Sequence, residues 1–286
     1  ELFGTGIVKS AEDFGIMGDA PSHPELIDWL AVEFRETWDV KKTLRLLVTS
    51  ATYRQSSVAT KEKIDKDPAN RLLSRGPRFR MDAEMIRDAA LEAAGLLSPK
   101  IGGPSVKPYQ PEGVWDAVGM RESNTKIYKR DTGEGLYRRS LYWFWKRMAP
   151  PASLEILNAP SREVSCLRRE RTNTPLQALV TLNDPQLIEC ARALAEKAMK
   201  NGSDDAARLR LIAMRALSRP LNDKEAAVVG RVRAGLLAHY KGKPEDAKAL
   251  IAVGESKADA ALDPAELAAW TMVCNQVLNL DESLNK

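Results

Sequence analysis

Residues 161–183 read SREVSCLRRERTNTPLQALVTLN and mark the change from an irregular polar stretch to a helical half of the chain. Thr174 stands directly before Pro175, which is a pair typical of a helix start. Threonine can cap the first turn, and proline fits inside that turn because its missing N–H would have no partner there. The segment therefore predicts a helix that begins at Pro175.

Helical signals also dominate on both sides of this segment. Ser22 and Glu25 have the spacing of a capping box, which places Ser22 at the N-cap, and Asp263 and Glu266 repeat the pattern. Asp39 is another candidate N-cap, and each candidate cap is followed by apolar residues at helical spacing. They predict helices over residues 25–34, 40–51, 82–96, 185–200, 204–217, 223–240 and 263–280. The sequence thus predicts a mainly α fold.

One stretch, residues 136–147, has the composition of a β-strand. It contains four consecutive aromatic residues, which favour extended backbone, and prolines at 150 and 151 end it. We expect a minor β element there, covered on both faces. The chain of 286 residues is expected to form a single domain, a fragment of a longer protein, with the Pro/Gly-rich stretch 98–111 as the candidate point of division.

The composition excludes several classes of protein. Hydrophobic residues make up 44% and charged residues 29%, which is typical of a globular chain. No stretch approaches the ~20 apolar residues of a membrane-spanning helix. Cys166, Cys190 and Cys274 stand too far apart for a CxxC pair or a CxxCH haem attachment, so no cofactor is expected on this chain.

No catalytic motif stands out. The only two histidines, His23 and His239, are too far apart in sequence to indicate a metal site. Ser22 beside His23 suggests a nucleophile and a base, but Ser22 is expected to cap a helix and no G-x-S-x-G elbow is present. We therefore interpret His23 as structural.

Basic residues concentrate between positions 126 and 171, where 11 Lys and Arg stand against 5 Asp and Glu. Two interpretations of this band are open: a core element with basic edges, or a surface on which aromatic rings and cations hold an anionic ligand. The arginines of 161–171 likewise indicate an ion-pair lattice or an anion site. The candidate ligand-binding residues are Arg138, Arg139, Trp143, Trp145, Arg162, Arg168, Arg169, Arg171 and Asn173.

Six stretches together resemble the planctomycete PSD domain, a large C-terminal domain of unknown function. They are SHPELIDWL at 22–30, TSATYRQS at 49–56, RGPRFR at 75–80, GGPSVKPYQP at 102–111, RERTNTPLQAL at 169–179 and LDPAELAAW at 262–270. The resemblance implies an exported, envelope-associated protein in which haem is carried by an upstream cytochrome-like domain. It assigns no catalytic residue.

The leading hypothesis is a binding or scaffolding domain of a large exported, cytochrome-associated protein that contacts an anionic polysaccharide. The rival is part of a hydrolase or haem-dependent oxidoreductase whose site is completed by upstream domains. Its expected polar contributors are Asp19, His23, Arg162, Glu163 and Asn173. Nucleic acid fits the chemistry of the basic band but does not fit export.

Overall fold

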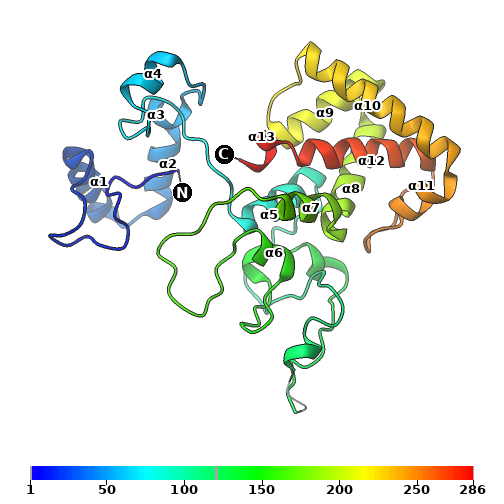
Figure 1. Ribbon diagram of the computed structural model, residues 1–286, viewed down its shortest axis with the longest axis horizontal. Coiled ribbons are helices and arrows are strands. Elements are labelled where there is room, and N and C mark those ends of the chain that lie inside the picture. Colours follow the sequence, from blue (N-terminus) through cyan, green and yellow to red (C-terminus); the bar gives the residue numbers. More distant parts are fainter. Residues whose placement is uncertain (1, 120–121, 286) are drawn as a thin grey trace. The chain divides into compact units, whose positions relative to one another are not determined.

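A computed structural model describes residues 2–119 and 122–285 and confirms the mainly helical class (Figure 1). The chain divides into two compact units. Unit 1 comprises residues 2–79 with 166–168, and unit 2 comprises the described residues of 80–165 and 169–285. The Pro/Gly-rich stretch 98–111 lies inside unit 2.

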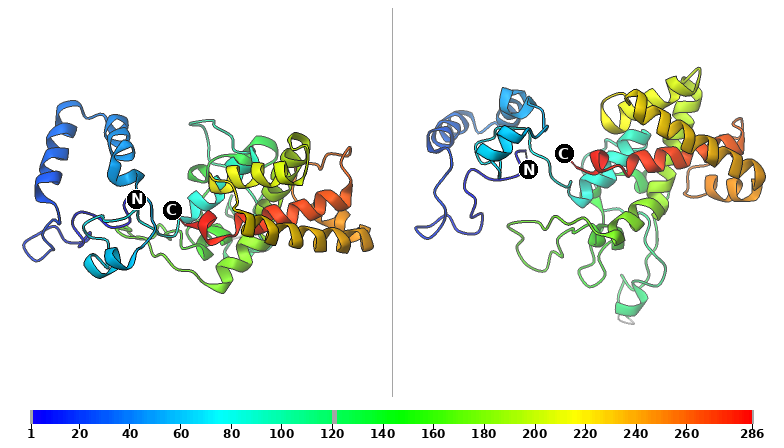
Figure 2. Two further views of the ribbon diagram at one scale, coloured as in Figure 1. Left: turned by 90° about the horizontal axis from the view of Figure 1, so that it is seen from above. Right: turned by 45° about the horizontal axis from the view of Figure 1, so that its top comes forward.

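Unit 1 contains four helices, and Figure 2 shows the first two running in opposite directions. They are α1 (Pro24–Thr37), α2 (Val40–Thr49), α3 (Ala51–Arg54) and α4 (Lys61–Lys66). The described part of unit 2 contains α5 (Ala83–Ala94), η1 (Asp116–Val118), η2 (Gly133–Tyr137), η3 (Ser140–Tyr142), α6 (Ala152–Ile156), α7 (Pro175–Asn183), α8 (Pro185–Asn201), α9 (Asp205–Leu217), α10 (Asp223–Gly242), α11 (Pro244–Ile251), α12 (Pro264–Leu278) and α13 (Asp281–Leu284).

Most of the predicted caps are present. Thr174 accepts a hydrogen bond from Gln177 N–H at the start of α7, and Asp39 and Asp263 cap α2 and α12 in the same way. The prediction for α1 was wrong, because its N-cap is His23 and no side chain caps its first turn. Ser22 therefore does not cap α1, although the sequence pattern predicted that it would.

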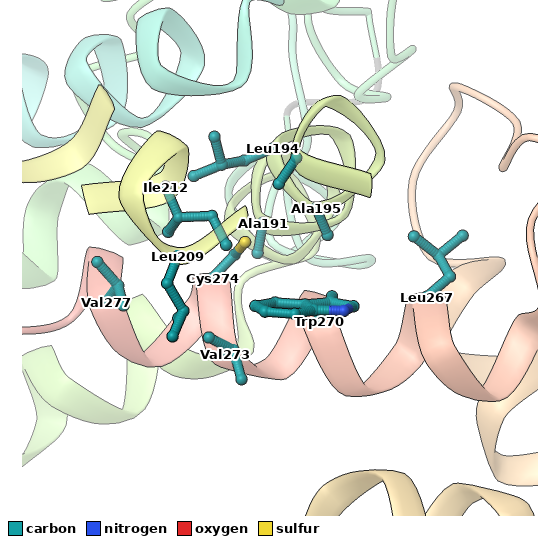
Figure 3. Close-up of a cluster of buried hydrophobic side chains, with 11 residues drawn as sticks. Ala191, Leu194, Ala195, Leu209, Ile212, Leu267, Trp270, Val273, Cys274 and Val277 are labelled. Atoms are coloured by element: carbon teal, nitrogen blue, oxygen red, sulfur yellow. The ribbon is translucent and has the colours of Figure 1, made fainter. Parts of the chain in front are cut away.

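The core of unit 2 forms where α8, α9 and α12 meet. Figure 3 shows the indole of Trp270 on α12 lying against Ala191 and Ala195 of α8. Trp270, Leu194 and both alanines are completely buried. The small alanine side chains let the two helices approach closely, so that the large indole fills the space between them.

Two further layers complete this core. Helices α10 and α11 pack on the other side of α12 through Tyr240, Ala247 and Ala268. Helix α5 packs on α8 through Leu91 and its alanines. It ends where Gly95 adopts a left-handed conformation with φ 68°, which glycine accommodates at little cost.

The expected β element at 136–147 is reduced to 3-10 helices and isolated bridges at Arg138 and Trp143. The reason lies in the hydrogen bonds. The buried Arg87 guanidinium donates to the carbonyls of Leu136 and Arg138, and Gln186 donates to Leu136 as well. Side chains thus satisfy backbone groups that a neighbouring strand would otherwise bind.

Candidate ligand-binding groove

Two of the nine candidate residues from the sequence are buried in unit 2. Trp143 is buried in a core cluster of unit 2, with the Arg87 guanidinium 5.0 Å from its ring centre. Arg138 is also buried, lies 3.8 Å from the Tyr142 ring centre and donates to three backbone carbonyls, one of them that of Gly102. For these two residues the structure favours the interpretation as core.

Four candidates lie on the surface. Arg139, Arg162, Arg168 and Asn173 are exposed. Arg162 is stacked on the half-buried Trp145, with 4.5 Å between the guanidinium carbon and the ring centre. Because the Trp145 indole also donates to the Ser161 carbonyl at 3.0 Å, this pair has a defined geometry.

Arg169 forms ion pairs outside its own segment. Its guanidinium donates to Glu84 at 2.6 and 3.2 Å and lies 3.5 Å from Asp82. Asp82 occupies the N-cap of α5 without making a side-chain cap bond, and its carboxylate faces Arg169. These ion pairs therefore hold Arg169 against the start of α5. Arg171 is half-buried.

The residues of the enzyme hypothesis fall in both units. Asp19 and His23 belong to unit 1, whereas Arg162, Glu163 and Asn173 belong to unit 2. Within the described residues, no group of three or more His, Cys, Asp or Glu is arranged to hold a metal ion. Nor does any helix in this part of the chain have the length and hydrophobicity to cross a membrane.

Two adjoining cavities of unit 2 lie in the basic, aromatic part of the chain. Their volumes are about 610 and 410 Å³, and Gln110, Pro111 and Arg130 line both. We call them together the groove. The larger cavity is also lined by Tyr109, Ala152, Ser153, Ile156, Leu179, Val180, Asn183, Asp184, Pro185 and Gly254. The smaller is also lined by Glu112, Gly113, Trp115, Asp116, Ile127 and Tyr128.

Arg130 stands where the two cavities meet. Its guanidinium carbon is 4.9 Å from the centre of the Tyr109 ring, and one of its nitrogens is 3.5 Å from Glu255. The side chain is 46% exposed, so it keeps N–H groups that solvent or a ligand can reach. Lys107 and Lys146 lie over the Trp115 ring at 5.5 and 4.7 Å and add positive charge near the smaller cavity.

Polar groups line the wall of the larger cavity. Asp184 caps α8 by accepting from Gln186 N–H at 2.9 Å, and burial raises the pKa of its carboxyl group. Gln110 is held at both ends of its amide, because it donates to the Pro150 carbonyl and accepts from Ala152 N–H. These polar side chains are thus fixed before any ligand arrives.

The floor of the groove rests on a buried carboxylate. Glu189 is fully buried on α8 and accepts hydrogen bonds from the Tyr109 hydroxyl at 2.9 Å and the Tyr137 hydroxyl at 2.8 Å. Ser256 adds two more, from its N–H at 2.7 Å and its hydroxyl at 2.6 Å. Burial, together with Glu189, raises the pKa of Tyr137 to about 12 and also raises that of Tyr109, so both hydroxyls keep their protons at neutral pH and donate hydrogen bonds to Glu189.

Arg192 completes this buried network. Its guanidinium donates to the Ser256 hydroxyl at 2.8 Å and to the Ser256 carbonyl, and pairs with Glu196 at 2.8 Å.

Gly254 passes directly over Glu189 with φ 94°, and a Cβ atom there would lie 2.6 Å from the carboxylate carbon. The network therefore requires glycine at this position.

Sequence reasoning missed the groove and its floor. Tyr109 lies in the Pro/Gly-rich stretch 98–111, and Glu189 and Arg192 lie in the helix predicted over 185–200, so no local pattern marks them as parts of one site. A usable signal was present, because Glu189 falls among Ile188, Cys190 and Ala191 within α8. A charged residue inside such an apolar stretch predicts a buried and paired carboxylate.

Residues 1–232 match a family model described as PSD1, protein of unknown function (DUF1553). No curated protein and no solved structure matches the chain.

Proposed function

We propose that this chain, which belongs to the PSD1 family of proteins of unknown function (DUF1553), is a binding domain of a larger exported protein and holds an anionic carbohydrate in the groove of unit 2. The observation that carries the proposal is the position of Arg130, a partly exposed cation at the junction of two cavities. A cation in that place can bind a sulfate or carboxylate group on a chain that extends both ways.

The chemistry of the wall supports a sugar. Apolar side chains such as Ile156 and Leu179 face the same space as Ser153, Asn183 and Asp184. Sugar rings present C–H groups on their faces and hydroxyl groups at their edges, so such a mixed wall is complementary to them. The size also fits, because ligand pockets typically enclose about 300–1,000 Å³.

The Arg162–Trp145 pair supports a second contact with the same ligand class. The aromatic ring and the guanidinium are stacked and reachable from solvent, as an anionic sugar would require. We place this pair second to the groove, because it lies on the surface and encloses no volume of its own.

Replacing Arg130 by glutamine is expected to weaken binding of a sulfated oligosaccharide about tenfold or more, since a lost charge-assisted hydrogen bond costs about 1.5–3 kcal/mol. Calorimetric titration of the full chain with a sulfated oligosaccharide and its desulfated counterpart measures this. The desulfated ligand should bind the wild type and the variant alike. Added salt should weaken only the sulfated complex.

Arg147→Gln is the matched control, because Arg147 is an exposed basic residue of unit 2 that does not line the groove. It should leave affinity nearly unchanged. Equal weakening by both substitutions would show that charge alone attracts the ligand, and it would refute the groove. Failure of the wild type to bind either ligand would refute carbohydrate binding itself.

A further inference from the structure

Unit 1 encloses a cavity of its own, of about 520 Å³. Helices α1 and α2 supply apolar walls through Leu26, Trp29 and Leu47, and Ser22 and His23 also face it. Trp29 is 49% exposed, and no apolar side chain among residues 2–79 is fully buried. The walls therefore present accessible apolar surface beside Ser22 and His23, two side chains of the kinds that act as nucleophile and base.

Ser22 and His23 are in hydrogen-bond contact, with 2.9 Å between the Ser22 Oγ and the His23 Nδ1. The Ser22 hydroxyl also lies 3.2 Å from the Ile7 carbonyl, to which it can donate. That carbonyl already accepts from Ser22 N–H at 2.9 Å and from the Arg71 guanidinium at 3.3 Å, which occupy its two lone pairs. That carbonyl is therefore a crowded acceptor, and the imidazole tautomer that carries its proton on Nε2 leaves Nδ1 able to accept the serine proton.

The start of α1 lies beside this pair. His23 is the N-cap, and its own side chain accepts no hydrogen bond from the first-turn N–H groups, such as those of Glu25 and Leu26. Backbone N–H groups at a helix start stabilise negative charge. They follow Ser22 closely in sequence, and such groups can donate to the oxyanion that forms when a serine attacks a carbonyl.

We propose that Ser22 and His23 form a nucleophile and base that hydrolyse carboxylic esters whose acyl group enters the cavity. The Ser22 Oγ forms a bond to the ester carbonyl carbon while its proton passes to His23 Nδ1. The bond to the leaving alcohol then breaks, and the alcohol takes that proton. Water repeats the sequence on the acyl-serine, which releases the carboxylic acid and restores the serine.

The shape of the site defines the substrate class. Its apolar walls favour aliphatic or aromatic acyl groups over acetyl, because burying additional CH₂ groups against apolar side chains is favourable. A p-nitrophenyl butyrate should therefore be hydrolysed several times faster than the acetate at low concentration. The proposal is independent of carbohydrate binding in unit 2.

A fluorophosphonate probe tests the site, since it reacts only with activated serines and loses fluoride. Peptide mass spectrometry of the labelled full chain should locate the adduct on Ser22. Ser22→Ala should abolish the adduct. His23→Gln should slow both labelling and ester hydrolysis by about 10²–10⁴, which is the usual contribution of a general base.

The control is Ser56→Ala, an exposed serine of unit 1 outside the cavity, which should label and hydrolyse like the wild type. Circular dichroism checks that each variant is folded. The position of the adduct on the wild type does not depend on any variant. Absence of an adduct on Ser22, or labelling that His23→Gln leaves unchanged, would overturn the proposal.

Discussion

Replacing Glu189 by alanine is expected to lower the free energy of unfolding of unit 2 by about 3–5 kcal/mol, the cost of breaking a buried charged network. The carboxylate accepts four hydrogen bonds, from Tyr109, Tyr137 and the Ser256 N–H and hydroxyl. Its loss leaves these donors unpaired inside the protein and removes a buried negative charge 4.0 Å from Arg192, which then keeps only Glu196 as an ion-pair partner. The floor of the groove should loosen together with the core.

Amide hydrogen exchange in α8 and α12 measures this change, because the slowest amides there report global unfolding of the unit. Glu245→Ala is the control. Glu245 is 82% exposed in its ion pair with Lys248, so removing it should change stability by less than about 0.5 kcal/mol. A loss below about 1 kcal/mol for Glu189→Ala would show that the network does not support the fold.

Replacing Arg87 by alanine is expected to cost a similar amount, about 3–5 kcal/mol, since its guanidinium is buried and fully engaged. It donates to Gln186 at 2.7 Å and to the Leu136 carbonyl at 2.8 Å, and it lies over Trp143. Arg87→Lys should recover little of this, because a single ammonium group cannot reach acceptors on both α8 and residues 136–140.

The same exchange experiment distinguishes this role from a general effect of removing a cation. Arg210→Ala on α9 is the matched control, since Arg210 is exposed, and its change should stay within about 0.5 kcal/mol. Amides of residues 136–144 should lose protection first in the Arg87 variant. Their unchanged protection would contradict the anchoring role of this arginine.

The helical elements were predictable from the sequence because they depend on local signals. The start of α9 is moved by one residue and that of α8 is as predicted, since Asp184 and Asp204 cap them as their residue types indicate. The short helices α3, α4, α6, α11 and α13 were not predicted. The capping box predicted at Ser22 is absent, because α1 takes His23 as its N-cap and the Ser22 hydroxyl contacts His23 and the Ile7 carbonyl instead.

The binding surface was less predictable, because it depends on contacts between distant residues. Aromatic and basic residues near 138–145 looked alike in sequence, yet Arg138 and Trp143 are buried while Arg139 is exposed. Arg87 and Gln186, 99 positions apart, decide which backbone groups of this stretch are satisfied. No local pattern in the chain encodes that pairing.

Hydrogen exchange with and without a saturating sulfated oligosaccharide tests the central claim, that the groove of unit 2 is the carbohydrate site, most directly. The groove predicts slower exchange in four stretches that line it, residues 109–113, 127–130, 152–156 and 179–185. Protection confined to the exposed arginines of 161–168, with these four stretches unchanged, would contradict it.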